Sequence, residues 1–147
     1  MTNHKILLAE DSPEDAELTM AVLGEYCLAN EVVHVADGAD ALDYIYRRGE
    51  FSARAADNPM LILLDLKMPR RDGMDVLRQV KSDPELRSIP VVLFTSSRQE
   101  QDLIDSYGLG ANAYVVKPVK FEEFAGAVKS IGLFWVLTNQ PPPGKVG

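Results

Sequence analysis

Short apolar runs alternate with helix-like segments along the whole chain. Between the apolar runs, apolar residues recur at spacings of three and four, which place them on one face of a helix. The third run is apolar at every position up to its final Asp65 and contains no Gly or Pro, as is typical of a central parallel strand. This alternation predicts an α/β doubly wound fold, with five parallel strands in one sheet and helices on both faces. The predicted strands are residues 5–9, 31–36, 60–65, 91–94 and 113–116.

Turn and capping residues mark the ends of the helices. Ser12 and Pro13 suit the N-cap and first position of a helix that runs to about Leu28, with Asp15 at the capping-box position. A loop is predicted over residues 47–59. The later helices are expected to follow Asp37-Gly38, to run from Gly73 to Asp83-Pro84, to end at Gly108 and to begin near Phe121. We expect one domain over residues 1–137 and a proline-bearing tail over 138–147.

Composition excludes several classes of protein. A net charge of -7 and a pI near 4.8 argue against binding to nucleic acid. Cys27 is the single cysteine, so no internal disulfide is possible, and its apolar neighbours predict a core position. The first apolar run is too short for a signal peptide or a membrane span. We therefore expect a cytoplasmic protein that does not associate with a membrane.

Polar groups follow four of the predicted strands, and the carboxyl ends of parallel strands meet at one edge of a sheet. Glu10-Asp11 follow the first strand, Asp65 ends the third, Thr95 follows the fourth and Lys117 follows the fifth. Two carboxylates about 4 Å apart repel by roughly 4 kcal/mol at an effective dielectric of 20. A divalent cation would relieve that repulsion, and oxygen ligands without clustered His or Cys favour Mg²⁺.

The same groups suit a phosphoryl group. Lys117 and the metal could neutralise its oxygens, and the Thr95 hydroxyl could donate a hydrogen bond to it. An Asp carboxylate can itself act as a nucleophile and form an acyl phosphate. The pattern therefore predicts a site for phosphoryl transfer at this edge of the sheet.

The motifs and their order resemble the receiver domain of two-component response regulators over about residues 5–133. The resemblance rests on Ala-Glu-Asp at 9–11, Leu-Leu-Asp-Leu-Lys-Met-Pro at 63–69, Asp72-Gly73, Thr95-Ser96 and Lys117-Pro118. It implies the (βα)5, flavodoxin-like receiver fold and a protein that accepts a phosphoryl group rather than an enzyme with a separate substrate. Its own chemistry would be self-phosphorylation and autodephosphorylation.

The resemblance also implies roles for individual residues. Asp65 would be the phosphoacceptor, and Mg²⁺ would be held by Asp11, by Asp65 and by the backbone carbonyl of Lys67, with Glu10 acting mainly through water. Lys117 would contact the phosphoryl group, and its bond to Pro118 would be cis. The side chain of Lys67 would influence how long the acyl phosphate survives, in a direction that the sequence leaves open.

Switching would follow from phosphorylation. Thr95 would move toward the phosphoryl group, and Tyr114 would turn inward to fill the vacated space. The surface formed by the fourth helix, the fifth strand and the fifth helix would then signal to a separate partner, whose identity the sequence does not give.

Two alternatives compete with this interpretation. Haloacid-dehalogenase-type phosphatases also use a strand-end Asp, Mg²⁺ and a Lys, but they generally carry a second Asp where this chain has Lys67. A pseudo-receiver would be a binding module that works without phosphorylation. The intact set of Asp65, Thr95 and Lys117 argues against it.

The last helix predicts partners. Residues 132–137 are almost all apolar, more than one buried stripe requires, and we expect a homodimer through Phe134, Trp135 and Leu137. This stretch and residues 106–112 are similar to single-domain receivers associated with bacterial and cyanobacterial phytochromes. That similarity implies a phytochrome histidine kinase as the phosphodonor.

Overall fold

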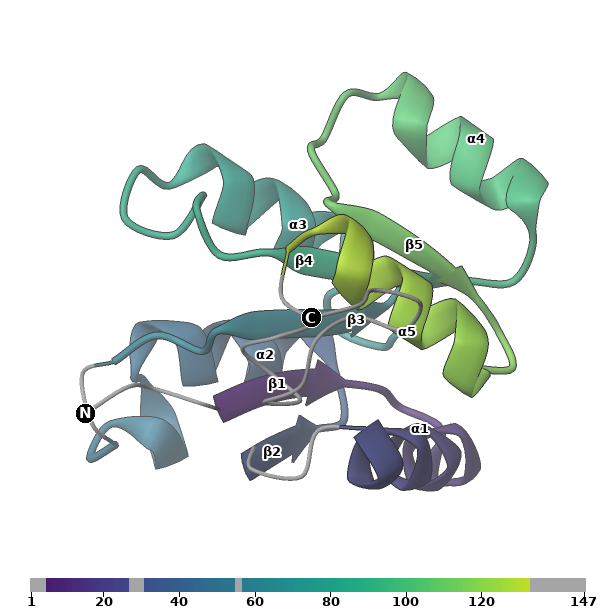
Figure 1. Cartoon of the computed structure of the whole chain (residues 1–147). Coiled ribbons are helices and arrows are strands. Elements are labelled where there is room, and N and C mark those ends of the chain that lie inside the picture. The colour runs from purple at the N-terminus through teal and green to yellow at the C-terminus, as the bar shows by residue number, and fades with distance from the viewer. Residues whose placement is uncertain (1–4, 27–30, 55–56, 133–147) are drawn as a thin grey trace.

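A single parallel sheet organises the molecule (Figure 1). The computed structural model describes residues 5–26, 31–54 and 57–132. The strands lie in the order β2-β1-β3-β4-β5, so the chain crosses over after its second strand, and the predicted doubly wound sheet is confirmed. The strands are β1 (Lys5–Ala9), β2 (Glu31–Val35), β3 (Leu61–Asp65), β4 (Val91–Thr95) and β5 (Ala113–Val116).

Helices cover both faces of the sheet, and each face has its own core. Alternate strand residues point to opposite faces, so Leu7 and Ile62 belong to one core while Ile6 and Leu61 belong to the other. The first core packs against α2 (Gly38–Tyr46), α3 (Gly73–Ser82) and α4 (Arg98–Ser106). The second packs against α1 (Pro13–Tyr26) and α5 (Phe121–Ser130). Every residue of β3 and β4 is buried, which explains why these runs are continuously apolar.

The fourth helix is the least embedded in the core. Ile104 is its buried residue, whereas Leu103 is 58% exposed and Tyr107, just after the helix, is 59% exposed. Figure 1 shows α4 at the periphery, with β5 between it and α5. The helix ends at Ser106 rather than at the predicted Gly108, because the chain needs a left-handed residue at Gly108 (φ 64°) to turn toward β5.

Other boundaries also differ from the predictions, since β3 begins at Leu61 rather than at Met60 and β4 extends one residue further, to Thr95. β2 ends at Val35, one residue early, and the expected loop over residues 47–59 contains a short 3₁₀ helix at Gly49–Phe51. Arg47 adopts a left-handed conformation (φ 57°) that ends α2 and starts this turn. No helix in the described part of the chain is long and apolar enough to cross a membrane. Cys27 and the predicted end of the first helix at Leu28 lie outside the described residues.

The helices α2, α3 and α4 begin at the carboxyl edge of the sheet with side-chain caps. Asp37 accepts a hydrogen bond from Asp40 N at 2.8 Å at the start of α2, and Asp72 accepts one from Asp75 N at 2.9 Å at the start of α3. Ser97 Oγ accepts one from Glu100 N at 3.1 Å at the start of α4. These caps satisfy amide groups that a helix leaves unpaired and fix the loops that surround the strand ends. The capping residues are Asp37, Asp72 and Ser97.

Candidate functional site

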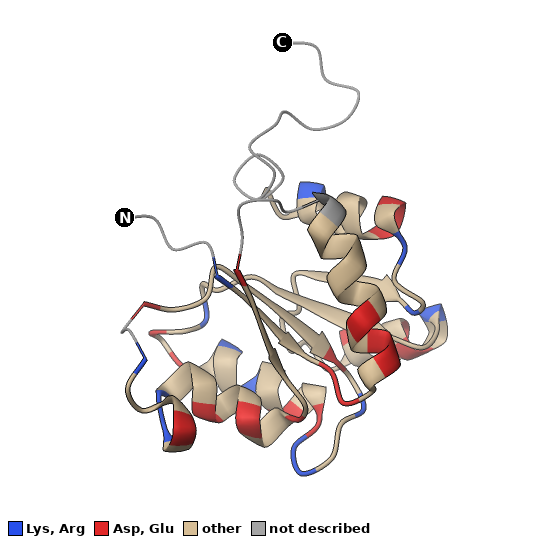
Figure 2. Ribbon diagram, turned by 90° about the horizontal axis from the view of Figure 1, so that it is seen from below, with Lys and Arg blue, Asp and Glu red and all other residues tan. Residues whose placement is uncertain are grey.

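The predicted strand-end residues meet at the carboxyl edge of the sheet. Asp65 is the last residue of β3 and Thr95 the last of β4, while Glu10 and Lys117 directly follow β1 and β5. Lys117 N donates to Thr95 O at 2.8 Å, so the backbone itself keeps the ends of β4 and β5 together. Figure 2 shows acidic segments (red) beside the arrowheads of the strands.

Three carboxylates form a compact cluster. Glu10, Asp11 and Asp65 each offer an oxygen atom, and these atoms lie within 4.8 Å of one another. Glu10 is fully buried and Asp65 is 6% exposed, whereas Asp11 is open to solvent. Burial, together with the neighbouring Glu10 carboxyl, raises the pKa of Asp65 to about 7, although Lys117 acts in the opposite direction. The cluster therefore carries charge repulsion that a cation would relieve.

Glu10 is held on all sides. Its backbone N donates to Val35 O at 3.0 Å, and its carbonyl oxygen accepts a hydrogen bond of 2.8 Å from His34 Nε2 in the tautomer that carries the hydrogen on that nitrogen. Its Oε2 accepts a hydrogen bond from Ser12 N at 3.2 Å. His34 thus positions the end of β1, a role that the sequence pattern did not reveal.

Lys117 lies among carboxylates. Its Nζ is 3.0 Å from Glu10 Oε1, 2.9 Å from Asp15 Oδ2 and 3.3 Å from Asp65 Oδ1. Burial lowers the pKa of Lys117, but Asp15, Glu10 and Asp65 together outweigh burial and hold it above its ordinary value. The bond from Lys117 to Pro118 is cis, as expected.

The contact with Asp15 corrects the predicted capping box. Asp15 N does bond to Ser12 Oγ at 3.3 Å, as the motif requires, but the reciprocal bond to Ser12 N comes from Glu10. Glu10 can accept from the Ser12 amide because it lies two residues before Ser12, directly after β1. The Asp15 carboxylate is diverted to Lys117.

Thr95 carries an unpaired hydroxyl. The residue is 1% exposed, and its Oγ1 has no hydrogen-bond partner among the described residues. Tyr114 on β5 instead has a partner, since its hydroxyl donates to Asp105 Oδ1 on α4 at 2.8 Å. Burial and this carboxylate raise the pKa of Tyr114 to about 12. Asp105 was not among the residues singled out from sequence.

The loop between β3 and α3 is held firmly from two sides. Arg70 has a left-handed backbone (φ 64°), and its guanidinium donates to Asp37 at 2.8 and 3.0 Å and to Asp40 at 2.8 Å. At the other side, a Cβ added to Gly73 would lie 2.4 Å from the backbone oxygen of Asp65. The Arg70 side chain thus connects the loop after Asp65 to the start of α2.

Lys67 reaches across the site to α4. Its side chain is 81% exposed, and its Nζ lies 3.8 Å from Glu100 Oε2. Glu100 Oε1 also accepts a hydrogen bond at 2.8 Å from Ser96 N, the residue before the N-cap Ser97, whose Oγ in turn accepts from Glu100 N. The ion pair joins the loop after β3 to the first turn of α4.

The donor set fits a hard divalent cation. The clustered groups are carboxylates, and the described residues place no Cys or His among them. The buried, unpaired oxygen of Thr95 lies at the end of the strand next to Asp65, where an incoming oxyanion would give it a partner. The residues predicted for the dimer, Phe134, Trp135 and Leu137, lie outside the described residues.

Comparison with known proteins agrees with this geometry. A family model for the response regulator receiver domain matches residues 6–129, so the chain belongs to the response regulator receiver family. Response regulator Rcp1 of Synechocystis sp. is 38% identical over 137 residues, covering 93% of this chain and 92% of that protein.

Solved structures are similar across almost the whole chain. The bacteriophytochrome response regulator RtBRR has a TM-score of 0.89 and 54% identity, over 97% of this chain and 86% of that one. The phosphorylated cyanobacterial phytochrome response regulator RcpA has a TM-score of 0.73 and 35% identity, over 97% and 100%. The Mn²⁺-bound form of Rcp1 has a TM-score of 0.72 and 34% identity, over 96% and 99%. The chain is a response regulator related to those of phytochromes.

Proposed function

We propose that this chain accepts a phosphoryl group on Asp65 from a phytochrome-type histidine kinase, in a Mg²⁺-dependent reaction. The observation that carries the proposal is the position of Asp65. It ends a fully buried strand, lies 3.3 Å from a lysine ammonium and belongs to a cluster of three carboxylates. Such a carboxylate is a poised nucleophile rather than a structural cap.

The chemistry follows from the residues present. An Asp65 oxygen attacks the phosphorus of a phosphohistidine, the P–N bond breaks, and the imidazole nitrogen leaves with the electron pair and takes up a proton. Lys117 neutralises a phosphoryl oxygen, and Thr95 donates the hydrogen bond for which its hydroxyl has no present partner. When bound, Mg²⁺ would supply positive charge for the phosphoryl oxygens.

Glu10, Asp11, Asp65 and the backbone carbonyl of Lys67 are the proposed metal-binding groups. The three carboxylates support this by their proximity, and the Mn²⁺-bound structure of the relative Rcp1 supports a divalent ion. Arg70 supports the role of the Lys67 carbonyl, because it fixes the loop that carries it. Asp65 must lose its proton to bind the metal, so metal affinity should rise with pH through about 7.

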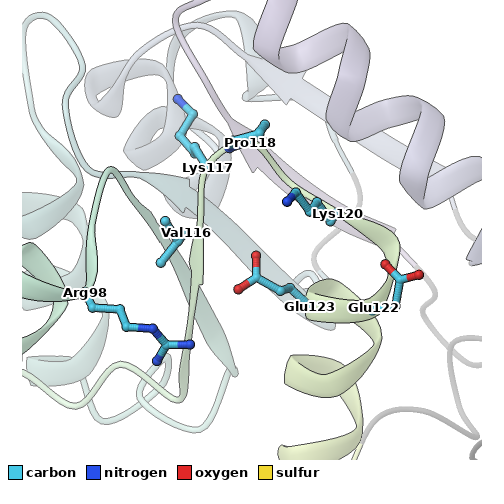
Figure 3. A pocket seen from close by; sticks show the side chains of 7 residues that line it. All are labelled: Arg98, Val116, Lys117, Pro118, Lys120, Glu122 and Glu123. Atoms are coloured by element: carbon cyan, nitrogen blue, oxygen red, sulfur yellow. The ribbon is translucent and has the colours of Figure 1, made fainter.

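Output would pass through the surface of α4, β5 and α5. A pocket of about 360 Å³ opens there, and Figure 3 shows its basic and acidic side chains. The Lys117 backbone borders this pocket while its side chain runs away from the other labelled side chains, toward the carboxylates. Lys117 thus connects the carboxylate cluster to the surface of α4, β5 and α5. The pocket is lined by Arg98, Val116, Lys117, Pro118, Lys120, Glu122 and Glu123.

Switching would use Thr95 and Tyr114. Thr95 gains a partner by moving toward the phosphoryl group, and Tyr114 would then leave Asp105 and turn into the vacated space. Because Asp105 belongs to α4, loss of its bond to Tyr114 would free the helix that contributes least to the core.

Homodimerisation is part of the proposal, through the last helix, α5, which ends at Ser130, and the C-terminal segment with Phe134, Trp135 and Leu137 that follows it, with residues 1–137 as the receiver domain and 138–147 as its tail. Sedimentation velocity over a concentration series tests it, and a monomer that persists at high micromolar concentration, with and without a phosphoryl mimic, would contradict it.

The identity of the kinase is tested separately by comparing phosphotransfer rates from a phytochrome kinase and from unrelated kinases. Equal rates would contradict the phytochrome assignment.

Labelling with acetyl phosphate and Mg²⁺, followed by intact mass, tests the central claim. The wild type should gain one phosphoryl group, and Asp65→Asn should gain none. Absence of an Asp65-dependent adduct would leave the pseudo-receiver as the better interpretation. The family match already supports a receiver over a phosphatase, and rapid turnover of phosphomonoesters would be needed to reverse that.

A further inference from the structure

We propose that Asp15 is a positioning residue that competes with the phosphoryl group for Lys117. The inference rests on the proposed function, because it assumes that Lys117 must reach a phosphoryl group on Asp65. It begins from a contact that the capping motif did not predict, the 2.9 Å approach of Asp15 Oδ2 to Lys117 Nζ.

Asp15 is available for this contact because another residue has replaced it in the cap. Glu10 Oε2 accepts the Ser12 amide, which the capping-box residue would ordinarily take. The Asp15 side chain is 42% exposed, so it could turn to solvent, yet it lies closer to Lys117 Nζ than Glu10 or Asp65 does. The first turn of α1 is thereby connected to the end of β5.

Asp15 does not belong to the carboxylate cluster that would hold the metal. Glu10, Asp11 and Asp65 gather their oxygens within 4.8 Å, and Asp15 is not one of them. A bound divalent cation would offset the charges of the cluster, but it would leave the Asp15 charge directed at Lys117. In the metal-loaded site, Asp15 is therefore the carboxylate that still draws the ammonium away from a phosphoryl oxygen.

This competition makes Asp15 a restraint on phosphorylation. Replacing its charge should free Lys117 for the phosphoryl group, which strengthens binding of a phosphoryl mimic and speeds labelling. A gain of this kind needs an intact site, so damage to the fold cannot produce it. Because Asp15 is partly exposed, water screens its charge and the gain should be only about threefold to fivefold.

The test compares Asp15→Asn with the matched control Glu14→Gln. Both replacements remove one charge from the first turn of α1, but Glu14 is exposed and makes no ion pair within the described residues. Calorimetric titration of each variant with beryllofluoride in saturating Mg²⁺ measures affinity for the mimic, and intact mass measures the rate of labelling by acetyl phosphate. Asp15→Asn should show about a threefold to fivefold gain in both, with Mg²⁺ affinity not increased, and Glu14→Gln should match the wild type.

A second comparison shows whether Asp15 acts through Lys117. In a Lys117→Ala background, Asp15→Asn should give no gain in labelling rate. An equal gain in both backgrounds, or in Glu14→Gln, would mean general charge repulsion and would overturn the proposal, as would an Asp15→Asn variant that labels no faster than the wild type. Failure of the wild type to label on Asp65 would instead overturn the proposed function.

Discussion

Two lysines at opposite edges of the sheet have opposite electrostatic surroundings. Lys117, at the carboxyl edge, lies among three carboxylates, which hold its pKa above the ordinary value despite burial. Lys81, near the amino ends of β4 and β5, donates to Arg87 O at 3.1 Å, Ile89 O at 2.8 Å and Asn112 Oδ1 at 2.9 Å, and burial lowers its pKa. Lys81, whose acceptors are neutral, holds backbone segments together. Lys117 instead contacts carboxylates, so its interactions change with any ligand that alters the charge of those carboxylates.

The contacts of Lys81 extend this contrast. Asn112 Oδ1, which accepts from Lys81, also accepts from Val91 N at 2.9 Å. The lysine and the amide together join the end of α3 to the segments that enter β4 and β5. All of these partners belong to the folded chain itself, so the contacts of Lys81 and Asn112 need no ligand. At the carboxyl edge, by contrast, the Thr95 hydroxyl has no partner among the described residues and three carboxylates lie close together.

The largest expected effect separates the two lysines by chemistry. Lys117→Met should slow labelling by acetyl phosphate about a hundredfold or more, because it removes a charge-stabilising donor from the reacting group. Lys81→Met should label within about twofold of the wild type, since it touches no residue of the site. Intact-mass time courses measure both. Equal losses in the two variants would remove the distinction between the edges.

Stability should separate the lysines in the opposite sense. Lys81→Met removes the side-chain donor of two carbonyls and one of the two donors of the Asn112 oxygen, which should cost about 1–3 kcal/mol in urea unfolding, equally with and without Mg²⁺. The cost of Lys117→Met should shrink when Mg²⁺ is added, because the metal takes over the compensation of the carboxylates. A Mg²⁺-dependent cost at Lys81 would contradict this contrast.

The raised pKa of Asp65 should make the free energy of unfolding depend on pH. Asp65 ionises near pH 4 when unfolded but at about 7 when folded without metal, so the folded state holds an extra proton between these values. Stability contributed by this group is present below about pH 4 and lost as the pH rises to about 7. Asp65→Asn avoids the loss and should be about 1–2 kcal/mol more stable than the metal-free wild type at pH 8, after allowance for screening.

The check is a series of urea unfolding curves from pH 4.5 to 8. The difference between Asp65→Asn and the wild type should grow with pH and should fall when Mg²⁺ binds the wild type. A difference in stability that stays constant across the series would mean that Asp65 ionises at its ordinary pKa in the folded protein.

A third lysine gives the smallest expected effect. Lys67 is exposed and pairs with Glu100 at 3.8 Å, so the pair should matter little for stability. Glu100→Gln keeps an oxygen for the Ser96 amide but releases Lys67, whose charge can then shield the phosphoryl group. The acyl phosphate should last about twofold longer, measured by loss of the adduct after acetyl phosphate is removed. A shorter lifetime would mean that Glu100 holds Lys67 in its protective position.

Local sequence patterns were sufficient to predict the strands, the helix starts and the ends of strands where the polar groups lie. Asp65 could be singled out because one carboxylate closing an apolar run is costly unless it has partners. The apolar run of β3 indicated burial on both faces, and parallel connectivity then required its end to lie beside the ends of β1, β4 and β5. The strands and helices that pack in the core were predicted well because the spacing of their apolar residues follows directly from which positions are buried.

The partners of the site residues were decided by tertiary structure. Asp15 matched a capping motif, but the end of β1 delivers Glu10 to the same amide and leaves Asp15 to Lys117. Sequence patterns did not reveal the roles of Arg70 and Glu100, because their contacts join segments that follow different strands. A sequence motif describes what a side chain can do with its near neighbours. Which carboxylate meets which cation depends on the strand order, and that order is set by the packing of the whole sheet.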